Sequence, residues 1–478
     1  MNKRTKIVCT IGPSSESVET LTKMLKAGMN TARLNFSHGN HAWHQKTIKK
    51  IRTISKKFDE PIGIIADLQG PRIRVGELPE KEIKLTVKEH IVITTNPKKT
   101  KEKILITGGD FHKDLSLGDR ILLDEGLLEL KVLKISSQDI FCEVVVGGML
   151  TSHKGVNFPD TKINIPSFTK KDKEDLEFAV SQNVDWVALS FVSEAREVYD
   201  VKYFIRDIEK KFGRPKNLPI RIIVKIEKNE AIKNFDEILE ATDGIMIARG
   251  DLGLEAAAED VPLFQKKIID KCLEAAKPVI VATQMLDSMI RKPRPTRAEV
   301  SDVANAVIDH TDAVMLSGET ASGLYPVLAV ATMTKIIEKI EASAYDDLVI
   351  GEIIKKIKPV DEAVGRVANI LARTVEAKAI LAASLSGYAG RIVCRYRPEL
   401  PVFVSTDSKE VEKQLALSWG TIPFVLPSCR SVEELVDRSI AYIKKKKFIK
   451  RGDKIIIIAG EPVGKSGNIN LIEIKEIV

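Results

Sequence analysis

The sequence contains few cysteines and few aromatic residues. The cysteines form no CxxC pair, and their odd number argues against a disulfide framework. Aromatic residues make up only 5% of the chain, so the basic and stacking composition of a single-strand nucleic-acid binder is missing despite a net charge of +8. We expect no nucleic-acid partner and mostly buried thiols among the five cysteines, which are Cys9, Cys142, Cys272, Cys394 and Cys429.

The chain also lacks a long hydrophobic run. No apolar stretch approaches the roughly 18 residues of a membrane helix. A strand-like pattern begins within about six residues of the N-terminus, too early for a secretion signal. With 44% hydrophobic and 29% charged residues, the 478-residue chain has the composition of a soluble protein of two or three domains. We expect a cytoplasmic protein without a membrane partner.

Eight short apolar runs each end in polar or charged residues, and a helical pattern follows almost every one. Continuous runs of Ile, Val and Ala are typical of parallel strands buried on both faces. Their alternation with helices predicts a (β/α)₈ barrel, whose chemistry lies at the carboxyl ends of the strands. The runs are 6–12, 30–36, 62–70, 186–192, 221–227, 244–251, 278–284 and 313–319.

Two stretches depart from this rhythm. Between residues 74 and 164, short alternating segments with Gly and Asp turns predict an all-β module inserted after the third barrel strand. A module inserted at this point would cover the catalytic face, which favours the role of a lid rather than an insertion without function. Strands alternate with helices again after residue 344. The predicted fold class is α/β: a (β/α)₈ TIM barrel (1–74 and 164–344), an inserted small β-barrel lid (75–163) and a C-terminal doubly wound α/β domain (345–478).

Lys225 and Glu227 lie two residues apart at the end of the fifth run and therefore share one face of their strand. A lysine beside a carboxylate at a barrel mouth is costly to bury without an ionic partner. A divalent cation with a phosphorylated ligand would satisfy both. Glu227 and Asp251 supply hard oxygen ligands that suit Mg²⁺, or Mn²⁺, and Gly250 lets a ligand approach the backbone. The alternative is a structural ion pair.

The other strand ends carry arginines, hydroxyls and carboxylates. Arginine binds phosphate and carboxylate groups in a bidentate manner, and no thiol or Ser-His-Asp set competes for the chemistry. One lysine, several arginines and a carboxylate pair together indicate phosphoryl transfer. These strand-end residues are Arg33, Asn35, Ser37, Asp67, Arg72, Arg74, Thr283, Gln284, Ser317 and Glu319.

The sequence resembles the pyruvate kinase family along nearly the whole chain. The resemblance implies the three-part plan above, with a regulatory C-terminal domain. It also implies the last step of glycolysis, a Mg²⁺-dependent phosphoryl transfer from phosphoenolpyruvate to ADP that yields pyruvate and ATP, and a homotetramer under allosteric control. The matching segments include TKIVCTIGPSS (5–15), RLNFSHG (33–39), ADLQGPRIR (66–74), KGVNFP (154–159), VKIEKNEA (224–231), GIMIARGDLG (244–253), the long segment 282–307, LSGETASGLYP (316–326) and RYRPELPVF (395–403).

Carried over position by position, the resemblance implies roles for the central charged residues. Lys225 stabilises the phosphoryl group in transfer, and Glu227 and Asp251 hold the Mg²⁺ that bridges it to the enolate. Arg33 binds the phosphate of phosphoenolpyruvate.

The same resemblance implies roles for their neighbours. The backbone at Ala248, Gly250 and the following aspartate orients the substrate carboxylate together with the Thr283 hydroxyl, which also helps to deliver the proton to the enolate. Arg74 and Lys154 reach the nucleotide phosphates, the latter from the edge of the lid.

Two departures from the family pattern bear on regulation. Many members bind K⁺ near the equivalents of Asn35, Ser37 and Asp67, with a glutamate where this chain has Arg72. The Arg72 guanidinium is expected to lie close enough to neutralise Asp67. The K⁺ site is therefore expected to be vestigial, and K⁺ is not expected to be required.

The second departure lies in the effector loop, which reads SLSGYAGR over residues 384–391. Ser384, Ser386, Gly387 and Arg391 keep the capacity to bind phosphate, but Tyr388 argues against fructose 1,6-bisphosphate. We expect a monophosphate such as AMP or a sugar monophosphate as the effector.

Two further patterns in the sequence resemble binding motifs. GEPVGKS (460–466) has three residues, not four, between its glycines and no helix after it, so it is not expected to be a P-loop. His38, His41 and His44 are expected to be solvated or capping rather than zinc ligands. Two other functions remain open: a metal-dependent barrel lyase or aldolase acting on pyruvate enolates, which would need neither Lys225 nor a nucleotide lid, and a non-catalytic metabolite sensor.

Overall fold

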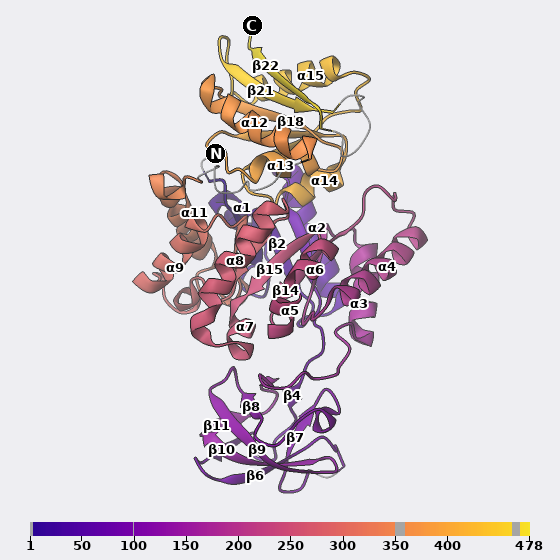
Figure 1. Ribbon diagram of the computed structural model, residues 1–478, viewed down its shortest axis with the longest axis vertical. Coiled ribbons are helices and arrows are strands. Elements are labelled where there is room, and N and C mark those ends of the chain that lie inside the picture. Colours follow the sequence, from indigo (N-terminus) through magenta and orange to yellow (C-terminus); the bar gives the residue numbers. More distant parts are fainter. Residues whose placement is uncertain (1–2, 99, 349–358, 461–468) are drawn as a thin grey trace.

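The computed structural model describes residues 3–98, 100–348, 359–460 and 469–478. Three units follow one another along the long axis in Figure 1: the C-terminal α/β unit, the barrel and the β module. The predicted fold class is confirmed. The domain limits at residues 74, 163 and 344 stay predictions. Within the described part of the chain, no helix is both long and apolar enough to cross a membrane.

All eight predicted barrel strands are present, each slightly shorter than its apolar run. They close a parallel barrel in the order β1-β17-β16-β15-β14-β13-β3-β2. The runs end early because their polar last residues leave the sheet and turn into loops or short helices at the catalytic face. The strands are β1 (Lys6–Thr10), β2 (Thr31–Asn35), β3 (Gly63–Asp67), β13 (Trp186–Leu189), β14 (Arg221–Ile226), β15 (Gly244–Ala248), β16 (Val279–Ala282) and β17 (Ala313–Leu316).

Helices surround the barrel and bury their apolar faces against the strands. Their starts follow from capping side chains: Asn40 caps α2, and Thr169 and Thr296 form capping boxes at α3 and α9. The helices are α1 (Val18–Ala27), α2 (His41–Phe58), α3 (Lys170–Ser181), α4 (Ala195–Lys211), α5 (Asn229–Lys233), α6 (Phe235–Ala241), α7 (Arg249–Glu255), α8 (Val261–Glu274), α9 (Arg297–Ile308), α10 (Gly318–Ala321) and α11 (Pro326–Glu341).

The inserted module consists of antiparallel and mixed strands in the order β12-β8-β9-β10-β6-β7-β4, with a separate pair β11-β5. Alternate residues point inward, and Leu128, Leu130 and Val132 of β9 are all buried. The strands are β4 (Arg74–Val75), β5 (Glu82–Leu85), β6 (His90–Thr94), β7 (Ile104–Thr107), β8 (Arg120–Leu123), β9 (Leu128–Ser136), β10 (Asp139–Val146), β11 (Gly148–Thr151) and β12 (Val156–Asn157).

The C-terminal unit is a sheet in the order β20-β19-β18-β21-β22, in which only the pairing of β21 with β22 is antiparallel. The sequence pattern predicted its strands but not α13. The GEPVGKS segment lies outside the described residues except for Gly460. The elements are α12 (Val360–Thr374), β18 (Ala379–Ala383), α13 (Tyr388–Cys394), β19 (Val402–Thr406), α14 (Lys409–Leu415), β20 (Thr421–Val425), α15 (Val432–Lys445), β21 (Lys454–Ala459) and β22 (Leu471–Glu476).

Helix α13 corrects the expectation of a loop over residues 384–391. Two turns of helix are too short to show a clear hydrophobic period. Gly387 begins the helix with a φ of 75°, and a Cβ atom at Gly390 would lie 2.6 Å from Val404 Cγ2. The helix therefore depends on two glycines, one for a left-handed backbone and one for close packing on β19.

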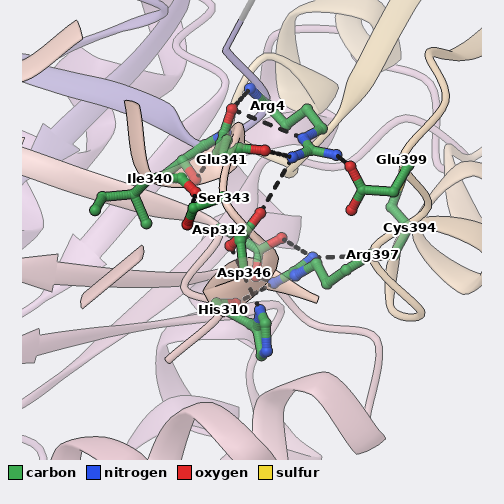
Figure 2. A network of polar contacts seen from close by, with 11 residues as sticks. Arg4, His310, Asp312, Ile340, Glu341, Ser343, Asp346, Cys394, Arg397 and Glu399 are labelled. Atoms are coloured by element: carbon green, nitrogen blue, oxygen red, sulfur yellow. Dashed lines mark hydrogen bonds and ion pairs between the residues drawn. The ribbon is translucent and has the colours of Figure 1, made fainter. Parts of the chain in front are cut away.

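The C-terminal unit covers the amino ends of the barrel strands, opposite the β module (Figure 1). Leu417 is fully buried and belongs to the core inside the barrel. Trp419 donates its backbone N–H to Asp312 Oδ1 at 3.0 Å, and the Asp312 carboxylate also pairs with Arg397 at 3.2 Å. Figure 2 shows the pairing of Asp312 with Arg397 and the neighbouring contacts of Arg4, which reaches across to Glu399. These contacts fix the C-terminal unit on the barrel.

The network in Figure 2 contains a carboxylate with an unusual proton affinity. Asp346 is 2% exposed, and burial raises its pKa to about 7, although Arg4 at 3.1 Å opposes the shift. An aspartate in an unfolded chain titrates near about 3.9. The folded state therefore binds this proton more tightly, so the contribution of Asp346 to the free energy of unfolding falls as pH rises from about 4 to about 7.

We expect Asp346→Asn to become more stable relative to the parent as pH rises from 5.5 to 8, by about 1–3 kcal/mol, because the amide does not ionise. Thermal unfolding at both pH values measures the effect. Glu399→Gln is the control, because this exposed partner of Arg4 should change the melting temperature little at either pH. A constant difference between Asp346→Asn and the parent would contradict the prediction.

Candidate active site

A cleft of about 480 Å³ lies between the carboxyl ends of the barrel strands and the β module. Most of the predicted site residues line it, although they come from distant parts of the chain. Some of them come from the ends of the barrel strands, and the others come from the β module and the chain segment that leads into it. The predicted residues that line the cleft are Arg33, Asn35, Ser37, Asp67, Arg72, Arg74, Lys154, Lys225, Glu227 and Asp251.

Lys225 lies at the centre of the cleft floor. Its ammonium group is 2.6 Å from Glu227 Oε1 and 3.7 Å from Asp67 Oδ1, and it donates a hydrogen bond of 3.0 Å to Ser190 Oγ. Burial alone would lower the pKa of Lys225, but the carboxylates of Asp67, Glu227 and Asp251 outweigh it and raise the pKa above its ordinary value. Lys225 is therefore a fixed positive charge at the mouth of the barrel.

Glu227 and Asp251 supply the oxygen ligands for a metal ion. Glu227 is 1% exposed, and burial raises its pKa to about 7 even beside Lys225. Its Oε2 atom accepts the Phe191 N–H at 2.6 Å. Asp251 lies in the first turn of α7, and its charge adds to the cost of ionising Glu227. The carboxylates of Asp67, Glu227 and Asp251 all act on Lys225, and this excess of negative charge fits a divalent cation. The described residues hold no cluster of three or more His, Cys, Asp or Glu ligands, so substrate or water oxygens would complete the shell, as Mg²⁺ prefers.

The partner of Asp67 differs from the expectation. Its Oδ2 atom pairs with Arg33 Nε at 2.6 Å, whereas the expected neutralising partner was Arg72. Arg72 lines the same cleft. The Asp67 carboxylate raises the pKa of Arg72, but burial and the charge of Arg74 have larger effects and lower it to about 10. The long arginine side chain after the glycine-proline turn could extend in several directions, and sequence spacing did not determine which one it takes.

Ala248, Gly250 and Thr283 lie beside the cleft at the ends of β15 and β16. The Thr283 hydroxyl accepts the Gly250 N–H at 2.8 Å and donates to Ala282 O at 2.6 Å. Thr283 has a φ of 70°, unusual for a β-branched residue and typical of functional sites. Arg249 pairs with Asp302 of α9 at 2.6 Å, a contact that the sequence analysis missed because α9 is remote along the chain.

Arg74 and Lys154 approach the cleft from the β module. The Val75 N–H donates to Lys154 O at 2.9 Å, so the two basic residues are neighbours across adjacent chain segments. Lys154 pairs with Asp124 at 2.8 Å, a partner that the sequence analysis did not identify. Asn157 Nδ2 donates to Glu255 Oε1 at 3.1 Å and joins the module to the end of α7. The module therefore forms one wall of the cleft.

Other predicted strand-end residues have structural contacts. Glu319 is buried and accepts the backbone N–H groups of Leu286 at 3.0 Å and Ser317 at 2.7 Å. Burial raises the pKa of Glu319 despite these hydrogen bonds. Gln284 follows Thr283 with a φ of 56°. These residues shape the loops after β16 and β17 rather than the cleft surface.

The three closely spaced histidines have different environments. His44 is buried and stacks on Phe36 with ring centroids 4.1 Å apart, and burial lowers its pKa to about 4. It is neither solvated nor a cap, which corrects that expectation. His41 Nε2 lies 2.7 Å from Asp175 Oδ1, and Asn40 rather than a histidine caps α2.

A second cavity of about 620 Å³ lies in the C-terminal unit. Ser384 and Tyr388 line it, together with residues of the loop after β19, whereas Ser386, Gly387 and Arg391 lie outside its lining. Arg391 is half-buried and lies beside barrel residues such as Cys272 and Asp312 instead, and desolvation lowers its pKa to about 9. The Tyr388 hydroxyl donates to Asp361 at 2.6 Å.

Comparisons with known proteins agree with this architecture. The family model "Pyruvate kinase, barrel domain" matches residues 2–330, and "Pyruvate kinase, alpha/beta domain" matches residues 362–475. The chain is 43% identical to a pyruvate kinase of Geobacillus stearothermophilus over 100% of its own length and 81% of that protein. It is 42% identical to pyruvate kinase 2 of Synechocystis over 99% and 79%. The crystal structure of a pyruvate kinase from Cryptosporidium parvum superimposes with a TM-score of 0.93 at 37% identity, covering 100% of this chain and 96% of that one.

Proposed function

Because this chain belongs to the pyruvate kinase family, we propose that its barrel cleft transfers the phosphoryl group of phosphoenolpyruvate to ADP, giving pyruvate and ATP. The chain is a phosphotransferase. The observation that carries the assignment of the site is the cleft itself, which is lined by Lys225 and Arg33 from the barrel strands and by Arg74 and Lys154 from the β module. Several cations around one cleft suit a phosphoryl group that passes between two phosphate-bearing molecules.

The residues of the floor bind and orient phosphoenolpyruvate. Arg33 is held by Asp67 through Nε and by Thr10 through Nη1 at 2.9 Å, which leaves its remaining N–H groups for the substrate phosphate. Lys225 presents its charge to the phosphoryl group as it moves. The backbone of Ala248 and Gly250 and the Thr283 hydroxyl orient the carboxylate beside this point.

Glu227 and Asp251 would hold Mg²⁺, or Mn²⁺ in its place. The bound ion supplies neutralisation of the negative charge that develops on the phosphoryl group and the enolate oxygen. Lys225 shares this electrostatic task from the protein side. The Thr283 hydroxyl would help to deliver a proton to the enolate, for which it would have to give up its hydrogen bond to Ala282 O.

A coupled assay with phosphoenolpyruvate and ADP tests the proposed function. Turnover that requires both substrates and a divalent cation supports it. Pyruvate formation without ADP would indicate a lyase or aldolase instead, and the absence of turnover would favour a metabolite sensor.

We propose that K⁺ is not required, and the prediction follows from the charges around Asp67. A K⁺ ion at Asn35, Ser37 and Asp67 would compete with cations that are already present: Asp67 Oδ2 pairs with Arg33 at 2.6 Å, Oδ1 lies 3.7 Å from Lys225 Nζ, and the Arg72 guanidinium adds positive charge to the same cleft. We expect substantial activity in K⁺-free buffer and little stimulation by added K⁺.

Arg72→Glu removes one cation and adds an anion, so partial K⁺ dependence is expected in this variant. The measurement is the initial rate across a K⁺ series at constant ionic strength with a tetramethylammonium salt. A parent enzyme that is nearly inactive until K⁺ is supplied would show the hypothesis to be wrong.

We propose that effector control acts through the cavity around Ser384, with a monophosphate such as AMP or a sugar monophosphate as the ligand. The hydroxyl-rich lining supports phosphate binding, and Tyr388 occupies part of the same lining. Isothermal titration with AMP, glucose 6-phosphate and fructose 1,6-bisphosphate is the measurement. Binding of a monophosphate that weakens in Ser384→Asp is the expected result, and tight binding of the bisphosphate would overturn it.

We propose a cytoplasmic homotetramer, as the resemblance implied. The exposed side chains of Val360, Val367 and Ile370 on α12 support a contact between copies, because they form one apolar stripe on the outer face of the C-terminal unit.

A further inference from the structure

Ser190 is an uncharged residue whose side chain contacts Lys225, in contrast to the carboxylates of Glu227 and Asp67. Ser190 follows β13 and is 3% exposed, and its Oγ atom lies 3.0 Å from Lys225 Nζ. An ammonium group can only donate hydrogen bonds, so the serine oxygen must accept. The single hydroxyl hydrogen is then available to Leu68 O at 2.8 Å. Both capacities of this buried hydroxyl are used, and its orientation is fixed.

The backbone around Ser190 is also fixed. Phe191 has a φ of 58°, and its N–H donates to Glu227 Oε2 at 2.6 Å. Gly70 packs so tightly against this turn that a Cβ atom there would lie 2.9 Å from Ser190 Cβ. Two consecutive residues therefore hold the two members of the ion pair: Ser190 holds Lys225 through its side chain, and Phe191 holds Glu227 through its backbone.

The chemical nature of the contact matters for the charge that Lys225 presents. The ammonium donates one of its three hydrogens to Ser190 Oγ and forms an ion pair with Glu227 Oε1 at 2.6 Å. A hydroxyl accepts a hydrogen bond from an N–H group and leaves the positive charge in place. A carboxylate accepts the hydrogen bond and also neutralises the charge. Without the serine oxygen, attraction would draw the ammonium toward Glu227 and Asp67, away from the transferring group.

We propose that Ser190 is a positioning residue for phosphoryl transfer, which holds the Lys225 ammonium so that its third hydrogen and its charge face the cleft. The inference rests on the role proposed for Lys225. Ser190 also lines the cleft, but because both hydrogen-bonding capacities of its hydroxyl are used, it acts through the lysine. Its loss therefore lowers kcat, while the KM for phosphoenolpyruvate, to which Arg33 and the residues around Thr283 contribute, changes little.

The test is a double-mutant cycle with Ser190→Ala, Lys225→Met and the double variant, measured by steady-state kinetics. Ser190→Ala is expected to lower kcat by about 10- to 100-fold with less than about a threefold change in KM. In the Lys225→Met background, the same change is expected to cost less than about twofold. Ser190→Thr, which keeps the hydroxyl, is expected to retain most of the turnover. Ser193→Ala, three residues along the same loop, is the matched control.

Thermal unfolding of each variant distinguishes a misfolded protein from a mispositioned lysine. If Ser190→Ala does not fold, Ser190→Cys replaces it, and the same loss of kcat is expected because a thiol is a weaker hydrogen-bond acceptor. Full turnover in Ser190→Ala together with a severe defect in Lys225→Met would overturn this inference alone. An equal cost of Ser190→Ala with and without Lys225 would also overturn it. Near-normal turnover in Lys225→Met would overturn the proposed role of the lysine and the inference with it.

Discussion

Lys225→Met is expected to lower turnover by several orders of magnitude while phosphoenolpyruvate still binds measurably. Methionine approximates the length of the lysine side chain without its charge. The ammonium acts where negative charge develops on the transferring phosphoryl group and on the enolate, and single preorganised groups of this kind contribute roughly 10²-fold or more. Arg33 keeps its contacts with Asp67 and Thr10 in this variant, so Arg33 is still expected to bind the phosphate of phosphoenolpyruvate before transfer.

The measurements are kcat in the coupled assay and the dissociation constant of phosphoenolpyruvate by titration calorimetry. Lys233→Met, an exposed lysine at the end of α5, is the matched control and is expected to behave as the parent. Near-normal turnover in Lys225→Met would remove the lysine from the proposed mechanism. A complete loss of substrate binding would show that it acts on the ground state instead.

Glu227→Gln and Asp251→Asn are each expected to raise the Mg²⁺ concentration that gives half-maximal activity. Each change replaces an anionic oxygen ligand by a neutral amide, which a hard cation binds more weakly. The effect of Asp251→Asn should be largely confined to the metal, so high Mg²⁺ should restore much of its turnover. Glu227→Gln also loses the charge that faces Lys225 at 2.6 Å, so a defect in kcat should persist at saturating Mg²⁺.

Mg²⁺ titrations at saturating substrates, repeated with Mn²⁺, measure the effect. Glu230→Gln is the control, because this glutamate also lines the cleft but is not one of the proposed ligands. If both variants keep the Mg²⁺ dependence of the parent, the ion is held by other groups.

Much of the fold was predictable because it depends on local periodicity. Continuous apolar runs separated by amphipathic helices can be buried only as parallel strands covered by helices, and all eight were identified from the sequence. The same pattern placed Lys225, Glu227 and Asp251 at one mouth, because the carboxyl ends of parallel strands meet there. Helix α13 was missed, because seven residues give too few apolar positions to define a helical period.

The sequence by itself determined which chemical groups this protein brings to its cleft, since strand order and side-chain alternation are properties of the chain. Only the tertiary structure decided which groups pair. Asp67 binds Arg33 rather than Arg72, Arg391 turns toward the barrel, and Ser190 contacts Lys225. The physical reason is that a long or buried side chain takes the orientation in which all neighbouring charges and hydrogen-bonding groups are satisfied together, and most of those neighbours are distant in sequence.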